Sequence, residues 1–172
     1  MAARKNPEHL EAPAVLTDGP PWRVDRGATG FRDAGAQPLP STDLTRFRAA
    51  CFTAARTAGG HVGVVTRLAM ATFHAVTITG PGWSRTVLCH AHLTAVAFPS
   101  APPQGWESPR TFDEPPDWAG QFALAGFRVL GQLELATPVE ELDLANLARA
   151  ERTQVSHWRP ATLGELLFNC WD

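Results

Sequence analysis

The chain has 172 residues, of which 44% are hydrophobic and 19% are charged, and its formal net charge at pH 7 is −2. This composition is typical of a globular protein that can bury a sizeable core, and it excludes an intrinsically disordered chain. The small net charge gives no reason to expect nucleic acid or an anionic membrane as a partner. We therefore expect a single globular domain over residues 21–172.

The charge is unevenly distributed along the chain. Residues 1–100 carry ten basic and six acidic side chains, whereas residues 101–172 carry five basic and eleven acidic ones. The two halves could attract each other, or either could attract a charged partner. Fourteen of the fifteen basic residues are arginines, a bias typical of a GC-rich bacterial coding sequence.

The three cysteines indicate a reducing environment. Cys51, Cys89 and Cys170 are widely separated and form no C-x-x-C pair, so the sequence predicts neither a disulfide framework nor a zinc ribbon. Neither an apolar signal segment near residue 1 nor a run approaching 18 apolar residues is present. We expect a cytoplasmic protein without a membrane partner.

The first part of the chain predicts a tail, a helix and a short strand. Residues 1–40 contain six prolines and four glycines, and we interpret residues 1–20 as a flexible tail. Apolar residues recur at helical spacing over residues 42–58, with Ser41 or Thr42 as the N-cap and Gly59 as the stop. Valines then favour a strand over about residues 62–67.

The longest strand-like stretch, residues 71–97, predicts a β-hairpin. Residues 80–84 (GPGWS) are turn residues, and a five-residue loop there places His74 opposite His90. His92 then lies on the same face as both. A slip of one residue would separate the three side chains, because successive side chains of a strand point to opposite faces.

His74, His90 and His92 are therefore the candidate catalytic and metal-ligating residues. Three imidazoles that converge across a strand pair can bind a divalent metal with an open fourth position, or act in acid–base catalysis. His157 is a further candidate for this site. The alternative is that these histidines are ordinary polar residues of a strand face.

The remainder of the chain predicts a loop followed by mostly helical segments. Residues 99–116 contain six prolines and predict a long irregular loop, a kind of segment that often carries function. A short helix over residues 117–126 and a strand over residues 127–137 follow. A helix over about residues 138–157 and a last helix, capped by Thr162 and extending to residue 172, complete the pattern.

Aromatic and acidic residues in these segments are candidates for an interaction surface. Trp106, Asp113 and Glu114 belong to the proline-rich loop, and Trp158 and Trp171 belong to the C-terminal segment. Tryptophan often anchors protein interfaces, and carboxylates could face a basic partner. The alternative is that the acidic residues are a solvated surface and the tryptophans close the core.

The sequence thus predicts an α+β fold. We expect an antiparallel β-sheet centred on the 71–97 hairpin, packed by one helix before it and two C-terminal helices. No motif is specific enough to name a function, since the chain lacks a P-loop, a nucleophile elbow and a kinase signature.

Two hypotheses of function remain open. The first is a small cytoplasmic bacterial binding protein without catalysis, such as an inhibitor, immunity-type or accessory factor that contacts another protein. The second is a small enzyme or ligand-binding protein with a site at His74, His90 and His92, with a divalent metal as its candidate cofactor.

Overall fold

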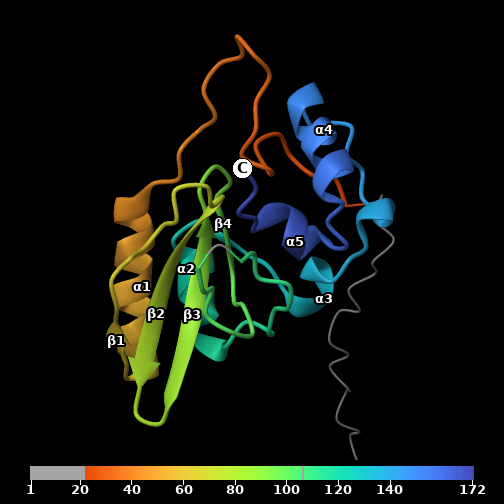
Figure 1. Ribbon diagram of the computed structural model, residues 1–172. Helices are drawn as coiled ribbons and strands as arrows, with labels where there is room; N and C mark the ends of the chain where they lie inside the picture. The colour runs from red at the N-terminus through yellow and green to blue at the C-terminus, as the bar shows by residue number, and fades with distance from the viewer. Residues whose placement is uncertain (1–21, 106) are drawn as a thin grey trace, which may run out of the picture.

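The computed structural model describes residues 22–105 and 107–172 (Figure 1). It confirms the α+β class, since a mostly antiparallel five-stranded sheet is packed by helices. The strands are His61–Val62 (β1), Phe73–Gly80 (β2), Trp83–His90 (β3), Ala95–Ala97 (β4) and Arg128–Val129 (β5). The predicted tail at residues 1–20 lies outside the described residues.

The helices fall before the sheet, between β4 and β5, and after β5. The α-helices are Leu44–Ala58 (α1), Gly120–Leu124 (α2), Gln132–Leu135 (α3), Arg149–Trp158 (α4) and Leu163–Leu167 (α5). Two 3₁₀ helices are Asp117–Ala119 (η1) and Val139–Glu141 (η2). Strands β1 to β4 pair antiparallel in sequence order, and β5 pairs parallel with β4.

Helix α1 confirms the helix predicted before the sheet. Its N-cap is Asp43, whose carboxylate accepts a hydrogen bond from the Arg46 amide at 3.0 Å. The predicted cap Thr42 instead donates its hydroxyl to the His90 carbonyl at 2.7 Å, which ties the start of α1 to the end of β3. Gly59 ends the helix in the left-handed conformation, at φ 68°, as a C-cap glycine does.

The predicted hairpin forms, but its predicted register is wrong. A two-residue turn, Pro81-Gly82, joins β2 to β3, so that Gly80 pairs with Trp83. His74 therefore lies opposite Cys89, while His90 lies opposite Phe73.

The reason for this register is the way in which Trp83 packs. A Cβ atom added at Gly80 would lie 2.3–2.5 Å from atoms of the Trp83 indole, so the ring lies directly over the glycine. Trp83 is thus a strand residue that covers the backbone of its cross-strand partner. The sequence-based interpretation had assigned it to the loop.

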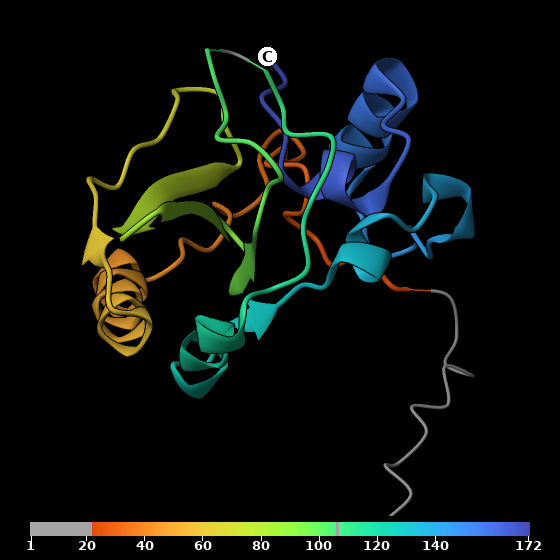
Figure 2. The same ribbon diagram turned by 90° about the horizontal axis from the view of Figure 1, so that it is seen from below.

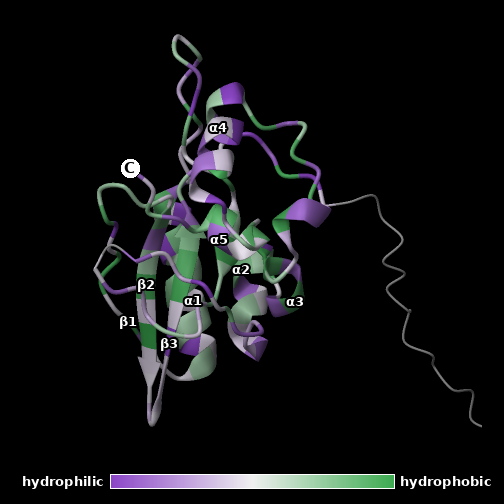
Figure 3. Cartoon of the chain, turned by 45° about the vertical axis from the view of Figure 1, so that its right-hand side comes forward, coloured by the Kyte–Doolittle hydropathy of each residue, from purple (hydrophilic) through white to green (hydrophobic). Residues whose placement is uncertain are grey.

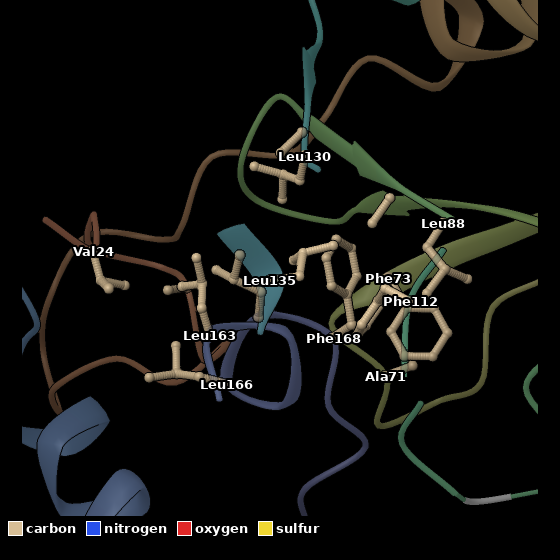
Figure 4. Packing of buried hydrophobic residues seen from close by; sticks show 14 of the residues in the cluster. Val24, Ala71, Phe73, Leu88, Phe112, Leu130, Leu135, Leu163, Leu166 and Phe168 are labelled. Carbon is tan, nitrogen blue, oxygen red and sulfur yellow. The ribbon is translucent and has the colours of Figure 1, made fainter. Parts of the chain in front are cut away.

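Both faces of the sheet are buried, with helices on either side (Figure 2). One face packs against α1 and α2 through Phe47, Cys51, Ile78, Val87, Cys89, Phe98 and Phe122. The other packs against α3, α5 and the proline-rich loop through Phe73, Leu88, Phe112, Leu135, Leu163, Leu166 and Phe168 (Figure 4). In Figure 3 the hydrophobic residues gather on β2, β3 and α5, whereas α4 is largely hydrophilic.

Three of the predicted elements are shorter than expected. The strand predicted over residues 62–67 is limited to β1 and a bridge between Thr66 and Ala75. The strand predicted over residues 127–137 ends after β5, and α3 follows. The last helix begins at its predicted cap, because the Thr162 hydroxyl accepts from the Glu165 amide, but it ends at Leu167.

The helix predicted over residues 138–157 is only half formed. It consists of the short helix η2 and then α4, which begins at Arg149. The methyl side chain of Ala148 cannot cap α4 by a hydrogen bond, and Asp33, 117 residues earlier, accepts from the Ala150 amide at 2.7 Å instead. A tertiary contact therefore supports the start of this helix.

A buried carboxylate connects the loop that precedes α1 with helix α4. Glu151 is fully buried, and its Oε1 accepts from the Gly27 amide at 2.9 Å and from both the amide and the hydroxyl of Thr29. Its Oε2 accepts from the Ala148 amide at 2.9 Å. These donors replace the water that the carboxylate loses on burial.

Among residues 22–105 and 107–172, no helix is both long and apolar enough to cross a membrane.

Candidate functional site

His90 is a fully buried structural side chain at the end of β3. Its Nε2 donates to the Ala28 carbonyl at 2.9 Å, and its Nδ1 accepts the amides of His92 and Leu93 at 3.1 and 3.0 Å. Burial lowers the pKa of His90 to about 4. The ring is therefore neutral near pH 7, and neither nitrogen is free to bind a metal.

The other two candidate histidines have different surroundings. His74 pairs with Cys89 and so faces the side of the sheet opposite to His90. Burial, followed by the charges of Arg67 and His92, lowers the pKa of His74. His92 donates its Nδ1–H to the Pro40 carbonyl at 2.9 Å, and its ring centroid lies 6.0 Å from that of His90.

The structure does not bring the three histidines together as a ligand set. Across the described residues, no group of three or more His, Cys, Asp or Glu side chains could hold a metal ion. His157, the further candidate, is exposed near the end of α4 with its ring against Trp158, at a centroid distance of 5.3 Å.

A cavity of about 670 Å³ lies between the proline-rich loop and the C-terminal segment. The loop contributes residues 101–105 and 107–111, and the C-terminal segment contributes Trp158, Pro160, Glu165, Cys170 and Trp171. Figure 2 shows the loop rising beside the C-terminus. The volume lies in the range of protein sites that bind ligands or peptide segments.

Two of the predicted interaction residues, Trp158 and Trp171, form one wall of this cavity. Their rings are stacked with an interplanar angle of 5° and a centroid distance of 6.2 Å. Trp171 is 7% exposed, whereas Trp158 is 39% exposed and donates its indole N–H to Gln154. Trp171 thus supports Trp158, which presents a large aromatic surface to solvent.

The proline-rich loop is anchored to the body of the protein at both of its ends. Phe112 is buried and its ring lies 5.6 Å from that of Phe168, centroid to centroid. Asp113 forms an ion pair with Arg85 and accepts the Ser100 hydroxyl at 2.8 Å. These contacts position the loop opposite α5.

A further hydrogen bond joins two residues that line the cavity. The Cys170 amide donates to the Ser108 hydroxyl at 2.9 Å, which joins the middle of the loop to the C-terminal segment. Burial raises the pKa of the Cys170 thiol, so the cavity presents a neutral thiol rather than a thiolate.

The charges in the cavity are mixed and slightly acidic. Glu107 and Glu165 contribute carboxylates and Arg110 contributes a guanidinium. The Glu165 carboxylate accepts from the Ala161 amide at 2.9 Å, which fixes its position at the start of α5. Sequence reasoning recognised Glu165 only as part of a helix cap and did not single out Glu107 or Arg110.

Asp113 and Glu114, two further interaction candidates, do not form part of this wall. Asp113 is engaged in the ion pair with Arg85, and Glu114 is exposed but does not line the cavity. Trp106 lies outside the described residues.

Comparisons with models of protein families, with curated proteins and with solved structures find no match to this chain.

Proposed function

We propose that this chain is a small, non-catalytic binding protein of the bacterial cytoplasm, and that the cavity between its proline-rich loop and its C-terminal segment receives an extended segment of a protein partner. The observation that carries the proposal is the stacked pair of Trp158 and Trp171 on the wall of this cavity. Exposed, supported tryptophans supply large contact area at little cost in conformational entropy.

The cavity is suited to a peptide rather than to a flat protein surface. Three loop prolines, Pro102, Pro103 and Pro109, line the cavity. A proline has no backbone N–H, so each of them offers only a carbonyl group for hydrogen bonding. An extended segment can donate its own amides to such carbonyls while its side chains pack against Trp158. Grooves lined by proline and tryptophan thereby combine backbone recognition with apolar contact.

The charge of this part of the chain favours a partner segment with a basic side chain. The cavity holds two carboxylates against one guanidinium, and residues 101–172 carry eleven acidic against five basic residues. An ammonium or guanidinium group over the Trp158 ring would gain a cation–π contact of about 0.5–1 kcal/mol. Glu165 lies on the same wall and would add an opposite charge.

A selection experiment with random peptides tests the proposal. The immobilised full-length protein is panned against displayed peptides of random sequence, and enriched peptides are synthesised and measured by calorimetry. We expect enrichment of Lys- or Arg-containing peptides. Trp158→Ala should weaken their binding at least about thirtyfold, which corresponds to the loss of about 2 kcal/mol at an interface hot spot.

Matched variants separate the cavity from the rest of the surface. Phe52→Ala removes another exposed aromatic ring, 59% exposed on α1, and should leave binding unchanged. Glu165→Gln should weaken the binding of basic peptides and leave the binding of neutral peptides unchanged. The absence of any enriched peptide, or equal binding to the Trp158→Ala and unmodified proteins, would overturn the proposal.

A further inference from the structure

A second cavity, of about 300 Å³, lies on another part of the molecule. It is enclosed by the segment 22–25, the loop between β3 and β4, the start of β5 and the end of α5. Its apolar lining includes Leu93, Leu130 and Leu167. A cavity of this size with an apolar lining and a few polar groups is typical of a site for a small molecule.

The principal polar group of this cavity is the guanidinium of Arg128. It lies over the ring of Trp22, with 3.7 Å between the guanidinium carbon and the ring centroid, and its Nη2 pairs with Glu134. The Arg128 amide also donates to the Thr94 carbonyl at 2.9 Å, which fixes the backbone below the side chain. The guanidinium is thus held by two contacts, with Trp22 and with Glu134.

Arg128 retains the capacity to bind an anion. A guanidinium carries five N–H donors, and the structure records a hydrogen bond only from Nη2, to Glu134. The side chain is 56% exposed, so its other donors can reach a ligand. A guanidinium that is already ordered loses little conformational entropy when two of its N–H groups bind the two oxygens of a carboxylate.

His92 contributes a second polar group with a defined tautomer. Its Nδ1–H donates to the Pro40 carbonyl, so in the neutral ring Nε2 carries the lone pair. His92 thus adds an imidazole to the polar part of the lining. Of the three predicted site histidines, His92 lines this cavity, whereas His74 and His90 line neither of the two cavities described here.

We propose that this cavity binds a small carboxylate with an apolar body, with Arg128 holding the carboxylate and the leucines holding the apolar part. This site does not depend on the peptide cavity, which shares no lining residue with it. Asp25 is the acidic group of the lining and is exposed. Its charge opposes the anion, so its removal should strengthen binding.

A matched series of four ligands tests the charge that the cavity selects. Phenylacetate, phenylacetamide, phenylethylamine and phenylalanine share one aromatic body and differ in their ionised groups. Each is titrated into the full-length protein while amide chemical shifts are recorded. We expect saturable shifts with phenylacetate at residues 22–25, 92–95 and 128–130, and at least about tenfold weaker binding of phenylacetamide.

Variants assign the binding to the cavity. Arg128→Gln should weaken the binding of phenylacetate about tenfold. Arg85→Gln, which removes another exposed and ion-paired arginine, should leave that binding unchanged. Because Arg128 also contacts Trp22, Thr94→Trp is a second test, since it places an indole at the exposed mouth of the cavity and should abolish binding in a folded protein. Asp25→Asn should strengthen binding.

Two results would overturn this inference. One is the lack of saturable shifts with phenylacetate up to its solubility limit. The other is a preference for phenylalanine or phenylethylamine that Asp25→Asn reduces, because the carboxylate of Asp25 would then recognise an ammonium group. Either result leaves the peptide proposal untouched, since that proposal depends on Trp158.

Discussion

Burial determines the chemical role of His90. The side chain has lost all contact with solvent, and its two nitrogens connect three backbone groups from the loop before α1 and the loop after β3. A neutral imidazole satisfies all three hydrogen bonds, whereas an imidazolium would lose its acceptor nitrogen. The His90 ring therefore stabilises the fold in its neutral form, and burial disfavours its protonation.

This arrangement predicts a loss of stability in acid. The pKa of His90 is lowered from about 6.5 in the unfolded chain to about 4 in the folded protein, so the unfolded chain binds the proton more readily. The stabilising effect is complete above pH 6.5 and falls by about 3 kcal/mol as the pH is lowered to 4, below which this residue adds no further loss. His74, whose pKa is also lowered, acts in the same direction.

Histidine NMR titration combined with urea unfolding at several pH values checks this prediction. The His90 ring should remain neutral down to about pH 4, and the free energy of unfolding should decline between pH 6.5 and 4. A ring that titrates near pH 6.5 in the folded protein would show that His90 is not buried as described.

At the scale of the element, the β2–β3 hairpin shows how one residue sets a register. The turn residues at positions 80–84 are compatible with loops of two or of five residues. Packing of the Trp83 indole over Gly80 selects the shorter loop and places Trp83 in the strand. That choice shifts each cross-strand pair by one position, which separates His74 from His90.

Gly80→Ala should therefore destabilise the protein. Its Cβ would lie within 2.5 Å of the Trp83 indole, and displacing the ring should cost about 1–3 kcal/mol. Gly120→Ala is the control, because nothing lies within 4 Å of the added Cβ and φ is −54°, so alanine should be neutral or stabilising by up to about 1 kcal/mol. Urea unfolding of both variants provides the comparison, and equal stabilities would refute the proposed role of Trp83.

At the scale of the whole molecule, the sheet connects two hydrophobic clusters. Neighbouring residues of β3 point to opposite faces, so that Val87 and Cys89 enter the cluster with α1 while Leu88 enters the cluster with α5. A strand that belongs to both clusters cannot lose one of them without exposing its other face. The two clusters should unfold in one cooperative transition.

Leu166→Ala tests this cooperativity. Leu166 is fully buried in the cluster with α5, and its truncation should cost about 2–5 kcal/mol. Hydrogen exchange should then accelerate by the same factor for the amides of α1, on the opposite face, as for those of α5. Leu133→Ala, at a leucine that is 82% exposed, should change stability by no more than about 0.5 kcal/mol. Two separate unfolding transitions would argue against a shared core.

The candidate sites also belong to this scale. The peptide cavity joins the loop at residues 101–111 to Trp158 and Trp171, and the carboxylate cavity joins residues 22–25 to Arg128. Sequence reasoning singled out the two tryptophans and His92, because exposed aromatics and clustered histidines are recognisable as residue types. It did not find Arg128, since an arginine on a short strand carries no local signal.

Local sequence patterns were enough to predict the α+β class, helix α1 with its stop at Gly59, the existence of the hairpin and the irregular loop at residues 99–116. Each of these depends on neighbours in the chain: apolar spacing, turn residues and proline content. Packing between distant segments sets the hairpin register, the burial of both sheet faces and the grouping of residues into cavities. It also brings Asp33 and Glu151 to the backbone amides at the start of α4. These features depend on contacts between residues up to about 120 positions apart, which local patterns do not contain.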